Sequence, residues 1–182
     1  MRKLLYSIIL IIAAVSLNSF TSKESSAFNA LPPEIGINIG DQAPEIVMKG
    51  IDGVELRLSN LRGKLVLIHF WASWDAKSRR DNRSYVETYE KYRNVKFNAA
   101  EGFEIFSVSL DQKKDSWEKA IAKDGLFWKS HVNDFKGSAN AAGGLYELQS
   151  TPSTWLIDEN GIILARNLHV EYLNSELDKY LR

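Results

Sequence analysis

Two polar residues three positions apart, Asp75 and Ser78, carry side chains that could take part in a reaction. They lie in the segment HFWASWDAKSRRDN, residues 69–82. A carboxylate can act as a general acid or a nucleophile, whereas a hydroxyl needs a neighbouring base to activate it. The structural alternative for Asp75 is a helix N-cap, because its side chain can accept N–H bonds at a helix start and complement the dipole. We favour the cap, and interpret Ser78 as a tolerated residue of the first helical turn.

The other chemically versatile residues form no recognisable site. The histidines at positions 69, 131 and 169 have neither a metal-ligand spacing nor a Ser-His-Asp arrangement. His69 falls in an apolar run, so we interpret it as a hydrogen-bonded histidine on a buried strand. No glycine-rich phosphate loop is present. We therefore predict no catalytic residue, no metal and no cofactor.

A basic cluster follows Asp75 and consists of Lys77, Arg79, Arg80 and Arg83. Cations at a helix N-terminus oppose the helix dipole, so their presence needs an explanation. One interpretation is a solvated helix face. The other is a docking patch for an anionic partner, including an anion bound at the helix terminus. The sequence leaves both open.

The absence of cysteine restricts the chemistry more than any motif does. The chain has 182 residues and Cys 0. It can form no disulfide, hold no zinc through thiolates and perform no thiol catalysis with its own residues. The 23 basic and 23 acidic residues give a formal net charge of +0. This balance argues against nucleic acid as the main partner, because phosphate binding requires basic excess.

The amino-terminal residues predict export of the protein. Arg2 and Lys3 precede an apolar run over residues 4–15 that is short for a membrane span. We predict a signal peptide at residues 1–20, cleaved near residues 16–27, and a linker at residues 21–35. An uncleaved membrane anchor is the alternative. Export predicts a periplasmic or otherwise extracytoplasmic location.

Residues 36–182 read as one folded α/β domain. Two short alternating runs around Asp52-Gly53 predict a hairpin, and the apolar runs at residues 64–74 and 103–111 predict buried strands. Helices are predicted after residue 75, at 115–125 with Asp115 as a cap, weakly at 138–148, and at 170–181. Residues 153–168 predict two strands joined by a turn. These elements predict a mixed central sheet flanked by helices.

Several motifs in order resemble the thioredoxin fold, and in particular the exported, TlpA-like thiol–disulfide oxidoreductases. They are GDQAPEI, LSNLRGKLVLIHFWASW, FSVSLD and STPSTWLIDENG, followed by a terminal helix. In that family a cysteine pair occupies the positions of Asp75 and Ser78. The resemblance implies that Thr151-Pro152 is the family's cis-proline, beside a peptide-binding edge that Trp71, Trp74 and Thr151 would line. Core packing is the alternative for both tryptophans.

Two hypotheses about function follow from the resemblance and the missing cysteines. The first is a non-catalytic module that binds a polypeptide or stabilises an assembly in the cell envelope. Its candidate surface comprises Trp74, Asp75, Lys77, Ser78, Arg79, Thr151 and Pro152. The second is a thiol–disulfide oxidoreductase or related peroxidase that uses the cysteines of a partner. The sequence makes no prediction about the oligomeric state.

Overall fold

The computed structural model describes residues 32–182. The predicted signal peptide at residues 1–20 and the linker up to residue 31 lie outside this range. The contacts of the domain begin slightly before residue 36, because the Gln42 N–H donates to the Glu34 carbonyl over 2.8 Å and Ile35 forms a β-bridge with Gln42. Within the described range, no helix is both long and apolar enough to cross a membrane.

A mixed sheet forms the centre of the domain, as the sequence predicts, and it has five strands. The strands are β3 (Leu65–Trp71), β4 (Phe103–Ser109), β5 (His131–Val132), β6 (Ser153–Ile157) and β7 (Ile163–Arg166). Their order is β5-β4-β3-β6-β7. The strand β3 runs parallel to β4 and antiparallel to β6. Every residue of β3 and β4 is buried, which explains why both read as nearly continuous apolar runs.

The predicted hairpin precedes the sheet. Strands β1 (Val47–Lys49) and β2 (Glu55–Arg57) pair antiparallel. The turn between them is closed by a hydrogen bond from Gly50 N–H to Val54 O, and Gly53 has a φ of 81°. A side chain is strained at such a φ, so glycine suits this position.

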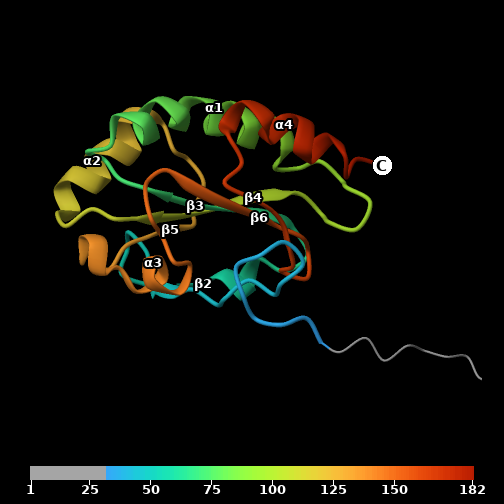
Figure 1. The fold of residues 1–182 in the computed structure, drawn as a ribbon. Helices are drawn as coiled ribbons and strands as arrows, with labels where there is room; N and C mark the ends of the chain where they lie inside the picture. The colour runs from blue at the N-terminus through green and yellow to red at the C-terminus, as the bar shows by residue number, and fades with distance from the viewer. Residues whose placement is uncertain (1–31) are drawn as a thin grey trace, which may run out of the picture. The chain divides into compact units, whose positions relative to one another are not determined.

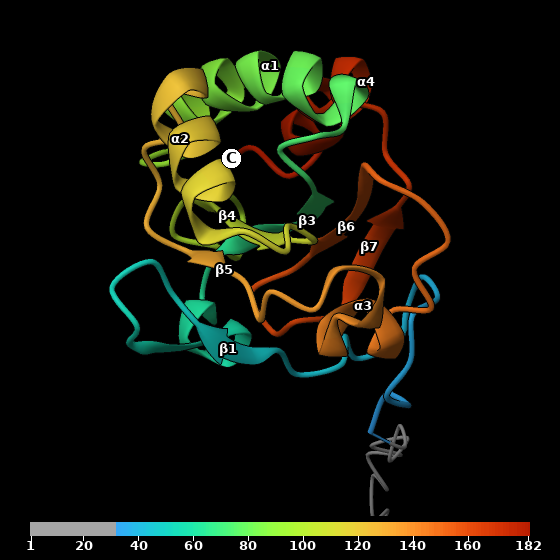
Figure 2. The same ribbon diagram turned by 90° about the vertical axis from the view of Figure 1, so that its left-hand side faces the viewer.

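Helices cover both faces of the sheet. They are α1 (Ala76–Tyr92), α2 (Lys114–Asp124), α3 (Ala141–Leu145) and α4 (Val170–Asp178), with short 3-10 helices at Leu58–Leu61 and Gly137–Ala139. Helices α1, α2 and α4 lie on one side of the sheet, and the hairpin and α3 lie on the other (Figures 1 and 2). The thioredoxin-like fold predicted from the sequence is therefore present.

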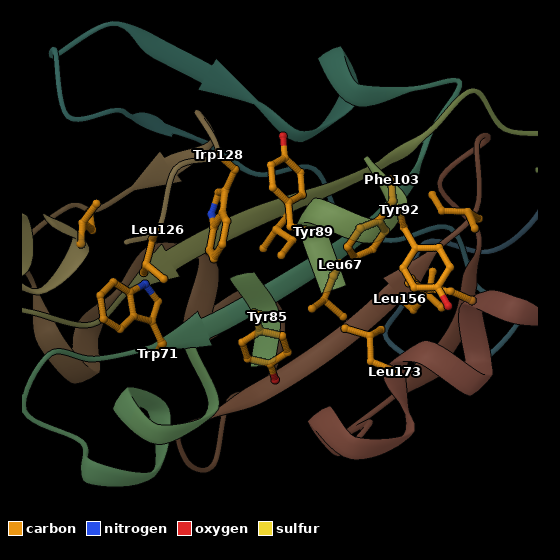
Figure 3. Packing of buried hydrophobic residues seen from close by; sticks show 14 of the residues in the cluster. Leu67, Trp71, Tyr85, Tyr89, Tyr92, Phe103, Leu126, Trp128, Leu156 and Leu173 are labelled. Atoms are coloured by element: carbon orange, nitrogen blue, oxygen red, sulfur yellow. The ribbon is translucent and has the colours of Figure 1, made fainter. Parts of the chain in front are cut away.

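The core on the α1, α2 and α4 side is rich in aromatic rings. Figure 3 shows Trp71 from β3 and Tyr85, Tyr89 and Tyr92 from α1 gathered between the helices and the strands. Trp71 is fully buried. Of its two interpretations, core packing is therefore correct, and Trp71 does not line a peptide-binding surface.

One detail of the predicted helices is wrong. Lys113, not Asp115, is the N-cap of α2, and it makes no capping hydrogen bond through its side chain. Asp115 lies in the first turn instead, where its charge still complements the helix dipole. The predicted end of this helix is confirmed, because Gly125 follows it in the left-handed conformation with a φ of 67°.

Candidate functional site

The helix start after β3 is built around the carboxylate of Asp75. Asp75 is the N-cap of α1, and its two oxygens accept hydrogen bonds from the backbone N–H groups of Lys77 and Ser78, each over 3.1 Å. The Ser78 hydroxyl donates to the same carboxylate over 2.6 Å. These are the backbone groups that a helix leaves without intrahelical partners, so Asp75 stabilises the start of α1.

The electrostatics of Asp75 agree with a structural role. Burial by itself raises the pKa of Asp75, but the hydrogen bonds from Ser78 and Lys77, with a contribution from the Thr151 side chain, outweigh it and bring the pKa below its usual value. An ionised carboxylate cannot donate a proton as a general acid near neutral pH. Ser78 is fully buried, so its hydroxyl does not reach a substrate.

His69 differs from its prediction in one respect. The ring is fully buried on β3, as predicted, but neither ring nitrogen has a hydrogen-bond partner within residues 32–182. Its centroid lies 4.5 Å from that of Tyr85, so an aromatic ring takes the place of a polar partner. Burial, with smaller contributions from the positive charges of His131 and Lys77, lowers the pKa of His69 to about 3. The ring is therefore neutral near pH 7.

The structure gives Arg79 a partner that the sequence did not reveal. Its guanidinium forms two hydrogen bonds with the Asp124 carboxylate, Nε to Oδ2 over 2.5 Å and Nη2 to Oδ1 over 2.6 Å. The Asn82 side chain donates to the same carboxylate over 2.7 Å. Burial raises the pKa of Asp124, but the bonds from Arg79 and Asn82 outweigh it and lower the pKa overall. Arg79 therefore joins α1 to α2.

The rest of the basic cluster is dispersed over the exposed side of α1. Lys77 pairs with Asp81 over 2.7 Å, and Arg83 faces Glu87 over 3.5 Å. Arg80 is exposed and takes part in no ion pair within residues 32–182. Because paired charges are largely compensated, the arrangement favours a solvated face over a concentrated anion site.

Trp74 is the most prominent exposed side chain beside the helix start. Its residue is 69% exposed, although Trp71, three positions earlier, is completely buried. The loop that carries Trp74 is held by Asp111, which accepts hydrogen bonds from the Ser73 N–H over 2.9 Å and the Ser73 hydroxyl over 2.5 Å. Because the loop is already fixed, binding through the Trp74 indole costs little conformational entropy of the backbone.

Asp111 is a site residue that sequence reasoning missed. The pattern indicated only that it ends a strand, yet its residue is 2% exposed and also accepts a hydrogen bond from the Ser109 hydroxyl over 2.8 Å. The Asn133 side chain donates to the Asp111 carbonyl over 3.1 Å. No sequence signal links Asp111 to Ser73, which lies 38 positions earlier.

Thr151 and Pro152 lie next to the helix start, in the loop before β6. The Thr151–Pro152 peptide bond is cis. Neither the N–H nor the C=O of Thr151 forms a hydrogen bond with another residue of the described range. Two unpaired main-chain groups at the end of a sheet strand can pair with an added chain.

Cavities lie on both sides of the loop at residues 147–151. The larger measures about 690 Å³, and its lining includes Trp74, Leu110 and Asp111. The smaller measures about 330 Å³, and its lining includes Lys77 and Pro152. Both volumes fall within or near the range of ligand pockets. Across residues 32–182, no cluster of histidine and carboxylate side chains could hold a metal ion.

Comparison with known proteins agrees with the fold. The chain is 29% identical over 154 residues to the thiol-disulfide oxidoreductase ResA of Geobacillus kaustophilus, covering 85% of this chain and 79% of that protein. Among solved structures, a thiol-disulfide oxidoreductase from Bacteroides fragilis matches with a TM-score of 0.68 at 30% identity, over 76% of this chain and 98% of that one. The thioredoxin domain of a thiol-disulfide oxidoreductase from Bacteroides vulgatus gives 0.71 at 26% identity, over 81% of this chain and 100% of that domain.

A match to a protein-family model shows which family the chain belongs to. Residues 39–166 match the model of the AhpC/TSA family, which is more than half of the 182 residues. The matched range includes Asp75 and Ser78 and the loop of Thr151 and Pro152. The chain therefore belongs to the AhpC/TSA family of thioredoxin-like proteins, and it carries no cysteine.

Proposed function

We propose that this protein is an exported, non-catalytic member of its family that binds a polypeptide through a surface formed by Trp74 and the loop at residues 147–151. The observation that carries the proposal is the pairing of an exposed indole with the unpaired backbone of Thr151, both on the wall of the 690 Å³ cavity. Tryptophan is one of the residue types enriched among those that dominate binding energy at protein interfaces.

Strand addition is the binding mode that suits this surface. The free N–H and C=O of Thr151 can form two main-chain hydrogen bonds with an extended peptide, and cavities on either side can take its side chains. Asp75 takes no part in chemistry in this proposal, because its carboxylate is occupied by the start of α1. The predicted signal peptide supports a location in the cell envelope.

The second candidate function is thiol–disulfide exchange with cysteines supplied by a partner. The names of the relatives favour it, because ResA and the Bacteroides proteins are called thiol-disulfide oxidoreductases. Fold alone does not imply function, and this chain contributes no thiol. The protein would act here only by positioning its partner.

A reductase assay separates the two candidates. We expect no reduction of a disulfide-bonded protein by dithiothreitol above the uncatalysed background when this chain is added. Turnover that depends on the chain would support the second candidate instead. The double variant Asp75→Cys/Ser78→Cys tests whether the fold can still support thiol–disulfide exchange. Reductase activity gained in this variant would show that only the thiols are missing.

Peptide selection tests the binding surface itself. Peptides enriched on the full chain from a random library should lose roughly 30-fold in affinity with Trp74→Ala, a typical effect for an interface tryptophan. Tyr172→Ala is the matched control, because Tyr172 is an aromatic residue 58% exposed on α4. Failure to enrich any peptide, or equal losses in both variants, would contradict the proposal.

A further inference from the structure

A third cavity, of about 490 Å³, lies apart from the surface around Trp74. It is formed by the hairpin on one side and by α2 and the segment between β5 and α3 on the other. Its apolar lining comprises Val47, Met48, Ile51, Trp117, Phe135 and Ala141. None of its lining residues belongs to the two cavities beside the loop at residues 147–151. We call this cavity the hairpin groove.

The hairpin groove leaves apolar surface exposed to water. Ile51 is 37% exposed and Phe135 is 36% exposed. The Phe135 ring packs edge-on against Trp117 with centroids 5.7 Å apart, so two aromatic rings contribute to the lining. A ligand that covers these side chains gains the free energy of removing apolar surface from water.

The backbone at Phe135 is held in an uncommon conformation. Its φ is 58°, in the left-handed region that bulky side chains rarely adopt. The Phe135 N–H donates to the Asn133 side chain over 2.7 Å, which helps to hold this conformation. Conformations of this kind cluster at ligand clamps and other functional positions, because surrounding structure must stabilise them.

The charges around the hairpin groove are mainly positive. Lys49, Lys114 and Lys136 line it. Lys49 and Lys136 have no ion-pair partner within residues 32–182, while Lys114 lies 3.6 Å from Glu118. Asp134 is the acidic residue in the lining, and its carboxylate oxygens already accept three hydrogen bonds. The free cations therefore favour a ligand with negative charge.

We propose that the hairpin groove binds an amphipathic carboxylate, with the apolar tail against Ile51, Trp117 and Phe135 and the carboxylate near Lys49 and Lys136. The volume falls in the range of about 300–1,000 Å³ that small-molecule sites occupy, and such sites combine an apolar lining with a few polar groups. The charge complementarity selects the head group, and the exposed apolar side chains select the tail. The proposal does not depend on the polypeptide surface at Trp74.

Titration calorimetry with decanoate and 3-phenylpropanoate, on the full chain, tests the proposal and separates a linear tail from an aromatic one. Decanol is the matched neutral ligand. We expect at least one of the two carboxylates to bind more tightly than decanol, and its affinity to fall in 0.5 M salt because screening weakens exposed charge pairs. Absence of binding by both carboxylates, or binding of neither carboxylate more tightly than decanol, would overturn the proposal.

Two double variants test whether the carboxylate binds in the hairpin groove. Lys49→Gln/Lys136→Gln should weaken carboxylate binding roughly tenfold, since each exposed charge contributes modestly. The control Lys119→Gln/Lys129→Gln removes two exposed lysines outside the groove lining and should leave the affinity unchanged. Equal effects of the two double variants would overturn the proposal.

A second variant, at Ile51, tests whether the ligand lies in the hairpin groove without removing a cation. Ile51→Glu places a negative charge in an exposed turn of the hairpin, so circular dichroism should show an unchanged fold. We expect it to weaken carboxylate binding by at least tenfold through like-charge repulsion. Trp74→Ala should leave carboxylate binding unchanged. Unaltered affinity in Ile51→Glu would place the ligand elsewhere and refute the assignment.

Discussion

Replacing His69 with phenylalanine should flatten the pH dependence of stability between pH 7 and pH 4.5. The folded protein holds this ring neutral, because burial lowers the pKa of His69 to about 3 and the ring has no hydrogen-bond partner within residues 32–182. In the unfolded chain the ring takes up a proton below its ordinary pKa of 6.5. The contribution of the buried, neutral His69 ring to the free energy of unfolding is therefore fully present above about pH 6.5. It is lost progressively as the pH falls toward 3.

The size of the effect follows from the two pKa values of His69. A pH of 4.5 is two units below the ordinary pKa of 6.5, so the His69 ring is protonated in the unfolded chain. In the folded protein the ring is still mostly neutral at this pH. Each unit corresponds to about 1.36 kcal/mol, so His69 lowers the free energy of unfolding by about 2.5 kcal/mol between pH 7 and pH 4.5. Burial also lowers the pKa of His131, to about 4, but that contribution is present in both proteins and cancels in the comparison.

Urea unfolding at pH 7, 6, 5 and 4.5 measures the difference. The wild-type protein should lose about 2.5 kcal/mol more than His69→Phe over this range. His169→Phe is the control, because His169 is exposed, and it should keep the wild-type slope. Equal losses in the wild type and His69→Phe would refute the reasoning, as would an NMR titration in which the His69 ring gains its proton near pH 6.

Three further substitutions test the local interactions of the helices, each by urea unfolding at pH 7. Asp75→Ala should cost about 0.5–2 kcal/mol by removing the cap of α1, and Asp75→Asn should retain most of the stability because asparagine is an equally good cap. Arg79→Leu should cost about 1.5–3 kcal/mol because it leaves the Asp124 carboxylate without its charged partner, whereas Arg83→Leu should cost under about 0.5 kcal/mol because its ion pair is exposed. Gly125→Ala should cost about 1–2 kcal/mol at a φ of 67°, and Gly125→Asn should cost less because asparagine tolerates this conformation.

Local chemistry made much of the fold predictable. The two buried strands are recognisable in the sequence as apolar runs, because both faces of β3 and β4 are covered. The hairpin follows from the turn residues Asp52 and Gly53, and the helix start follows from the capping side chain of Asp75. Each of these features depends on residues within a few positions of one another, so the sequence displays it directly.

Interactions between distant segments were not predictable in the same way. Arg79 forms an ion pair with Asp124, which lies 45 positions later in the sequence. This residue of the basic cluster therefore links two helices. Asp111 fixes Ser73 across 38 positions. Periodicity reports which face of an element is apolar, but it contains no information about which polar side chains meet after the elements pack.

The candidate site shows the same division. The composition alone shows that this chain has no thiol, whatever its fold, and the local sequence predicts Asp75 at a helix start. The packing of the folded chain buries Trp71 and exposes Trp74, and it leaves His69 without a hydrogen-bond partner within residues 32–182. The physical reason is that burial and the pairing of polar groups depend on what the other strands and helices place against a residue, and the chain brings those neighbours from remote positions only when it folds.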